Sequence, residues 1–136
     1  MKTIVIASTL FLSFTSKATG TPPDAVTAAF KQMFPTVTDV KWGKEDGTEW
    51  EGEFTLNGNE MSANFSEDGK WIETETEIEI SALPNAVVDG INATYPGAKI
   101  TEANVVKNAS GGFYEVDLSG AIVHEAAFNV DGSPVK

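Results

Sequence analysis

One pattern of residues occurs twice in this chain, and it limits the fold more than any other feature. Pro23-x-Ala25-Val26-x-x-x-Phe30-x-x-x-Phe34-Pro35 returns at an offset of 61 as Pro84-x-Ala86-Val87-x-x-x-Ile91-x-x-x-Tyr95-Pro96. Ala63-x-Phe65-x-x-Asp68-Gly69 returns at an offset of 63 as Ala126-x-Phe128-x-x-Asp131-Gly132, and Trp50-Glu51-x-x-Phe54 matches Tyr114-Glu115-x-x-Leu118. Self-similarity of this kind indicates that one supersecondary unit is used repeatedly. We therefore predict two tandem units, at about 21–80 and 81–136.

Each unit is expected to begin with an amphipathic helix. Apolar residues recur at helical spacing in both: Val26, Phe30, Met33 and Phe34, then Val87, Ile91 and Tyr95. Thr21 can cap the first helix, with Pro22 in its first turn. Pro35 and Pro96 should end the two helices, because the residue before a proline is pushed out of the helical region.

The rest of each unit has the pattern of antiparallel strands. Turn dipeptides separate the expected strands: Asp46-Gly47, Asn57-Gly58, Asp68-Gly69, Gly111-Gly112, Ser119-Gly120 and Asp131-Gly132. Between these turns, apolar and acidic residues alternate, which is typical of a sheet that is covered on one side only. The predicted fold class is α+β, with two tandem α-β-β-β(-β) units, both helices packed on one face of the sheet, and the two halves joined through a long strand at 70–80.

The first eighteen residues look like an export signal rather than part of the fold. Lys2 precedes an uncharged apolar run from Thr3 to Phe14, and Ser16 and Ala18 place small residues at the positions that a signal peptidase reads. The run is too short to span a bilayer, which needs about 20 residues. We expect a signal peptide over 1–18, a mature domain over 19–136, and a periplasmic or extracellular location. Because the chain has no cysteine, no lipid anchor is expected.

The charge balance is strongly acidic and excludes several classes of partner. The chain has 20 acidic residues, nine lysines and no arginine, for a net charge of −11. Nucleic-acid binding requires basic residues that neutralise phosphates, and anionic membrane surfaces attract the same residues. We therefore expect neither nucleic acid nor membrane insertion after signal removal. The lack of cysteine also excludes disulfides, thiolate zinc sites and a cysteine nucleophile.

Several of these motifs resemble one known family. The carriers are the Pro-x-Ala-Val…Phe-Pro helix, the strand around Trp42, the Trp50-Glu51-x-x-Phe54 strand and the Asp68-Gly69-Lys70-Trp71 turn. Together they are similar to the PepSY-like, putative beta-lactamase-inhibitor-like family of small secreted bacterial proteins. The resemblance covers nearly all of 21–136. It implies a duplicated helix-and-sheet fold, an envelope or extracellular location and an inhibitory role.

No residue pattern predicts catalysis or a tightly bound metal. His124 is the only histidine, at a position equivalent to Met61 on a strand that we expect to face the core. A serine hydrolase would need a Gly-x-Ser-x-Gly elbow, and a zinc site would need further histidines or cysteines. A glycosidase would need two distinct carboxyl groups in a cleft. We expect no enzyme activity and no cofactor, while weak surface calcium remains an alternative.

The most unusual feature is a row of four glutamates, Glu73, Glu75, Glu77 and Glu79, that follows Trp71. Such a row is either a solubilising face or a docking surface for a cationic protein, with Trp71 as an anchor. The candidate partner-binding residues are Trp71, Glu73, Glu75, Glu77, Glu51, Glu53, Glu115 and Asp117. The predicted function is a non-catalytic exported binding module, for example an inhibitor of a secreted or periplasmic hydrolase. The alternative is an envelope protein that binds a cation or small ligand.

Overall fold

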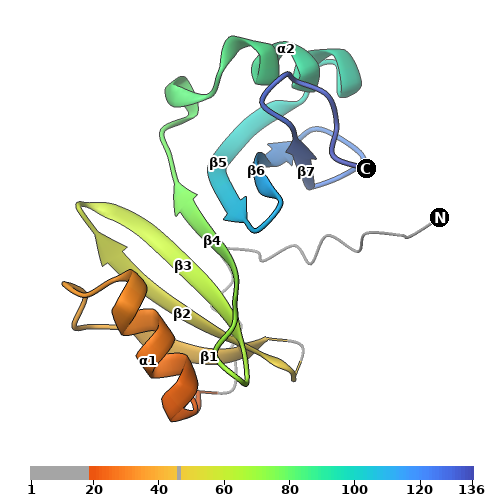
Figure 1. The fold of residues 1–136 in the computed structure, drawn as a ribbon. Coiled ribbons are helices and arrows are strands. Elements are labelled where there is room, and N and C mark those ends of the chain that lie inside the picture. The colour runs from red at the N-terminus through yellow and green to blue at the C-terminus, as the bar shows by residue number, and fades with distance from the viewer. Residues whose placement is uncertain (1–18, 46) are drawn as a thin grey trace.

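The computed structural model describes residues 19–45 and 47–136 (Figure 1). The predicted signal peptide, 1–18, lies outside the described residues. In chain order the elements are α1 (Asp24–Met33), β1 (Lys41–Glu45), β2 (Glu49–Leu56), β3 (Asn59–Ser66), β4 (Trp71–Glu77), the 3-10 helix η1 (Ile80–Ala82), α2 (Asn85–Thr94), β5 (Lys99–Asn108), β6 (Gly111–Ser119) and β7 (Glu125–Phe128).

The strands form one seven-stranded antiparallel sheet in the order β1-β2-β3-β4-β5-β6-β7. β4 pairs with β3 on one side and with β5 on the other, so it joins the two halves of the sheet. The α+β class and the junction through this strand are confirmed. The internal repeat stays a prediction, although each half of the sheet follows one helix.

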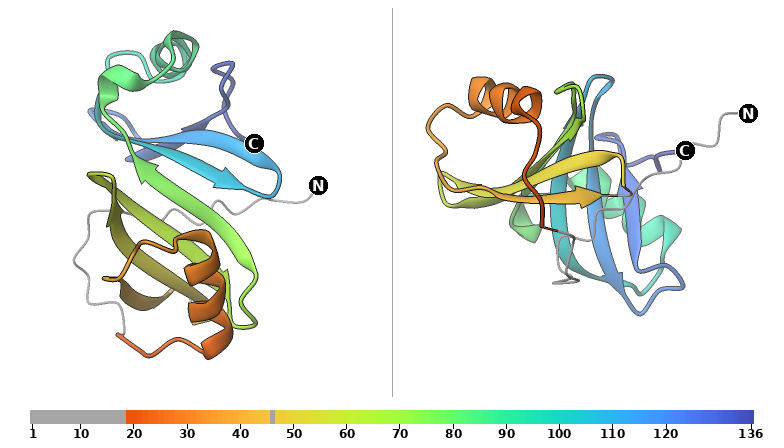
Figure 2. Two further views of the ribbon diagram at one scale, coloured as in Figure 1. Left: turned by 60° about the vertical axis from the view of Figure 1, so that its left-hand side comes forward. Right: turned by 90° about the horizontal axis from the view of Figure 1, so that it is seen from below.

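The two helices lie at opposite ends of the molecule, because the sheet twists and bends between its two halves (Figures 1 and 2). Val26 and Phe30 of α1 pack with Phe54 and Phe65 in a first core. A second core around α2 contains Val87, Ile91, Val116, Leu118 and Phe128. A single cross-strand row links the two cores: Met61, Thr76, Val105, Tyr114 and Phe128. Both helices therefore cover the same face of the sheet, as predicted.

The helix ends agree with the prolines but not with the predicted cap. Phe34 leaves the helical region with φ −128°, and Pro35 follows it, so the predicted end of α1 is confirmed. At the other end Pro23, not Thr21, precedes the helix, and no side chain caps it. The capping prediction was wrong because Pro22 and Pro23 are consecutive. The second proline pushes the first out of the helical region, so the helix cannot begin before Pro23.

His124 does not face the core. It is exposed in a bend before β7, and Ile122 two residues earlier is fully exposed. The predicted core-facing strand from 122 was wrong because the β6–β7 connection is longer than a tight turn, and pairing resumes only at Asp117↔Glu125. From there the predicted alternation holds, since Phe128 is buried in the second core.

Candidate functional site

The face of the sheet opposite the helices carries carboxyl groups from both halves of the sheet. Directly paired residues on antiparallel strands project from the same face. Strand pairing places the following residues there, which we call the acidic face: Glu51, Glu53, Glu73, Glu75, Glu77, Glu102, Glu115, Asp117 and Glu125. Seven of the eight predicted partner-binding residues are among them.

Trp71 is the predicted residue that this face does not include. Asn64 pairs with Glu73, but the next residue, Phe65, pairs with Trp71, so β4 carries an extra residue at a bulge. The bulge reverses the alternation and turns Trp71 toward the helix side. There the half-buried ring packs against the first core, and its Nε1 donates a hydrogen bond to Thr74 Oγ1 at 2.9 Å. The expectation that Trp71 shares a face with the glutamate row was therefore wrong.

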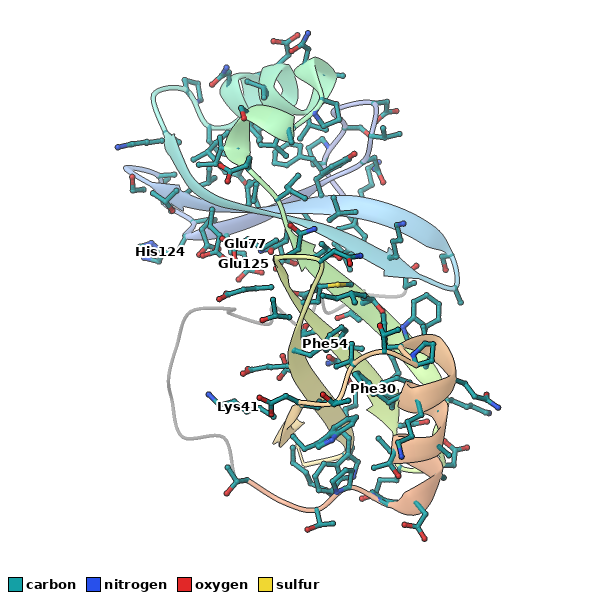
Figure 3. All side chains as sticks on the ribbon, turned by 90° about the vertical axis from the view of Figure 1, so that its left-hand side faces the viewer. Phe30, Lys41, Phe54, Glu77, His124 and Glu125 are labelled. Atoms are coloured by element: carbon teal, nitrogen blue, oxygen red, sulfur yellow. The ribbon has the colours of Figure 1, made fainter. Side chains whose placement is uncertain are left out.

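The middle of the acidic face is buried rather than open to solvent. Glu51 is 1% exposed, Glu75 2% and Glu115 4%, whereas Glu53 is exposed. Alternation along a strand assigns a side chain to a face, but it carries no information on how a sheet bends or on how much water reaches that face. The predicted solvated row is thus a row of deeply placed carboxyl groups with a more accessible edge. In Figure 3, Glu77 and Glu125 lie on this face, between the two halves of the molecule.

The structure strongly shifts the titration of Glu115. Burial, together with the negative charges of Glu75, Glu125 and Glu73, raises its pKa to about 9. Both effects disfavour the ionised form, since desolvation and like charges each destabilise a carboxylate. At neutral pH the Glu115 carboxyl therefore holds a proton. The pKa of Asp117 is raised too, by burial and by the charge of Glu125.

A hollow of about 390 Å³ adjoins the acidic face where β4 ends. Four carboxyl groups line it, from three separate segments: Glu60, Glu77, Glu79 and Glu102. Burial raises the pKa of Glu77, and Glu60 adds to this shift. Burial also raises the pKa of Glu102, while a hydrogen bond from Asn104 opposes that shift. The hollow therefore favours positive charge in its occupant.

Sequence reasoning missed several members of this region, notably Glu102, Asn104 and Glu125. A bulge between Ile100 and Glu102 interrupts β5, so its alternation cannot be followed from Lys99 onward. From Glu102 the pattern does alternate, since Ala103 lies in the second core while its neighbours on either side face away. A pairing of 102–108 with 111–117 through the Gly111-Gly112 turn would have identified Glu102 and Asn104, while Glu125 is placed by its pairing with Asp117.

The described part of the chain contains no group of three or more histidine, cysteine, aspartate or glutamate side chains arranged to hold a metal ion. Within the same residues, no helix is long and apolar enough to cross a membrane.

Comparison with known proteins identifies relatives by family and by fold. Residues 48–132 match the family described as "Putative beta-lactamase-inhibitor-like, PepSY-like". A DUF2874 family protein from Bacteroides uniformis is 23% identical with a TM-score of 0.75, covering 85% of this chain and 88% of that one. A BLIP-like protein from Bacteroides fragilis is 22% identical with a TM-score of 0.72, covering 88% and 86%.

A third solved structure, of "putative periplasmic proteins" from Bacteroides eggerthii, is 20% identical with a TM-score of 0.74, covering 86% of this chain and 88% of that one. At these identities the likeness establishes the fold. No curated protein matches the chain.

Proposed function

The chain belongs to the PepSY-like, putative beta-lactamase-inhibitor-like family, and we propose that it is a non-catalytic exported module that binds a cationic protein through its acidic face. The observation that carries the proposal is the segregation of side chains across one sheet. Apolar residues of the strands face the helices, while the carboxyl residues of the acidic face gather on the other side.

A concentration of like charge at low exposure is unfavourable for the free protein. Burial and mutual repulsion both act against ionised carboxylates. A partner with a basic surface would relieve this repulsion and would be steered toward the face by long-range attraction. A merely solubilising face would not need Glu51, Glu75 and Glu115 to be buried, since charges solubilise a protein from exposed positions.

Two further observations support the proposed location and class of partner. The predicted signal peptide and the periplasmic description of the Bacteroides eggerthii protein support a periplasmic or extracellular site of action. The family description and the BLIP-like protein from Bacteroides fragilis support an inhibitory role. We infer a secreted or periplasmic hydrolase as the partner.

Quantitative affinity capture tests this proposal with three versions of the purified exported protein. The first is the wild type. The second carries Glu53→Lys, Glu73→Lys and Asp117→Lys on the acidic face, at residues that are exposed or half-buried. The third is a control with the same charge change at exposed positions elsewhere: Asp24→Lys, Asp39→Lys and Asp89→Lys.

We expect the wild type and the control to capture the same envelope protein and the face variant to lose it. Equal capture by all three would contradict docking through the acidic face. Capture that requires added calcium would favour the alternative cation-binding function.

A further inference from the structure

Asn104 lies at the centre of the acidic face. It pairs with Glu77 of β4 on one side and with Glu115 of β6 on the other. Its side chain is 4% exposed, and its Nδ2 donates a long hydrogen bond of 3.4 Å to Glu102 Oε1. Its Oδ1 is buried and has no hydrogen-bond partner. A buried acceptor without a donor is unfavourable, and in a native structure it calls for an explanation.

Ser62, on β3, which β4 separates from the strand of Asn104, also has a buried polar atom without a hydrogen-bond partner. It is 1% exposed, pairs with Glu75 and Glu53, and its Oγ has no hydrogen-bond partner. Carboxyl and amide oxygens are the main polar atoms of this part of the face, and they accept hydrogen bonds. A group that carries several N–H donors and a positive charge would satisfy these acceptors.

We propose that Asn104, together with Glu77, Glu102 and Glu115, forms a socket for a lysine or arginine side chain of the protein partner. The inference rests on the proposed function, because it names the group by which the partner would engage the acidic face. A basic side chain supplies both the donors that Asn104 Oδ1 lacks and the charge that the carboxylates favour. A metal ion fits less well, since the described residues offer no suitable cluster and calcium takes six to eight oxygens.

Protonation of the free protein is consistent with such a socket. The groups that face Glu115 from the surrounding strands are acidic or neutral: Glu73 and Glu75 from β4, Asn104 from β5 and Glu125 from β7. Burial among these groups raises the pKa of Glu115 to about 9, so its carboxyl is neutral before binding. An entering cation would favour the ionised carboxylate, and binding would then release a proton to the buffer.

The test uses two synthetic peptides that differ in one charge. Acetyl-Gly-Arg-Gly-amide presents a guanidinium group, and acetyl-Gly-citrulline-Gly-amide has nearly the same shape without the charge. Each is titrated into the ¹⁵N-labelled exported protein and followed by NMR.

The protein variants are Asn104→Leu, which removes the acceptor, Glu115→Gln, which mimics the protonated carboxyl, and Asp89→Asn as a control on α2. Circular dichroism checks that each variant is folded.

We expect saturable shifts of the Asn104 side-chain amide with the arginine peptide and none with the citrulline peptide. Binding should weaken at least tenfold in Asn104→Leu and in Glu115→Gln and stay unchanged in Asp89→Asn. Calorimetry in two buffers of different ionisation enthalpy should show proton release for the wild type and none for Glu115→Gln.

Equal shifts with both peptides, or wild-type binding by Asn104→Leu, would overturn the socket. Matching shifts produced by calcium chloride alone would overturn it too. Failure of the socket is separable from failure of the docking face. If the captured partner binds Asn104→Leu normally but not the Glu53/Glu73/Asp117 variant, only the socket is wrong.

Discussion

The stability of this protein should fall as the pH rises from 5 to 8, and Glu115 should be a principal cause. Burial and the acidic neighbours Glu75, Glu125 and Glu73 raise the pKa of this carboxyl from the ordinary 4.5 to about 9 in the folded protein. Between these values the folded protein keeps a proton that the unfolded chain releases. Stability therefore decreases with pH, by at most 1.36 kcal/mol per pH unit for one proton. From pH 5 to pH 8 the loss is about 4 kcal/mol as an upper limit, since the neighbouring carboxyls titrate as well.

Glu115→Gln isolates this contribution, because glutamine keeps the shape of the protonated carboxyl and does not ionise. The variant should match the wild type near pH 5 and exceed it in free energy of unfolding at pH 8 by up to about 4 kcal/mol. The assay is urea denaturation followed by tryptophan fluorescence at half-unit pH steps. Asp89→Asn, at an exposed position on α2, controls for the change in net charge alone.

Other groups with shifted pKa values account for the pH dependence of stability that should remain in Glu115→Gln. Burial also raises the pKa values of Glu77, Glu102 and Asp117, so the variant should keep a weaker slope of the same sign. Hydrogen bonds lower the pKa values of Asp68 and Asp131. The contribution of these two groups to stability is lost only as the pH falls below about 3.8, which is outside the range from pH 5 to pH 8. If stability instead rises from pH 5 to pH 8, or if Glu115→Gln has the slope of the wild type, the reasoning is refuted.

Four other substitutions test the packing and the exposed position of His124. Gly132→Ala should lower the free energy of unfolding by more than about 2 kcal/mol in thermal denaturation, because φ is +84° and an added Cβ would lie 2.0 Å from the carbonyl oxygen of Ala86 in α2. The control Gly97→Ala, at φ +80° with open space around the added Cβ, should lower it by only about 1 kcal/mol. Equal losses in the two variants would refute the close contact at Gly132. Trp71→Ala should lose about 2 kcal/mol of stability while the folded fraction keeps its partner affinity, and a selective loss of affinity would place Trp71 in the interface. His124→Ala should change melting and binding little, within about 0.5 kcal/mol, because the side chain is exposed.

The sequence was sufficient for the fold class because hydrophobic pattern and turn chemistry agree along most of the chain. Helical spacing predicted both helices, and Pro35 correctly predicted where α1 ends. Alternation predicted which face the helices cover and placed Glu51, Glu75 and Glu115 together on the other one. Trp50, at the start of the strongest alternating strand, is buried in the first core.

The errors share one physical cause, which is that alternation assumes an unbroken strand. A single extra residue in β4 turned Trp71 to the opposite face, and the bulge after Ile100 hid Glu102 and Asn104. His124 was misplaced because the connection before β7 is longer than its turn dipeptide indicates. Burial of the acidic face depends on the bending of the whole sheet, which no local pattern records.

The salt dependence of association tests docking through the acidic face most directly. Surface plasmon resonance would measure the rate at which the captured partner associates with each of three proteins: the wild type, the Glu53/Glu73/Asp117→Lys variant and the Asp24/Asp39/Asp89→Lys control. Each rate would be measured across a range of ionic strengths. Attraction between opposite charges weakens as salt screens it. We expect the wild type and the control to associate fastest at low salt, and the face variant to associate at least about tenfold more slowly there, with a reduced or reversed salt dependence. Identical rates and identical salt dependence for all three proteins would contradict the account.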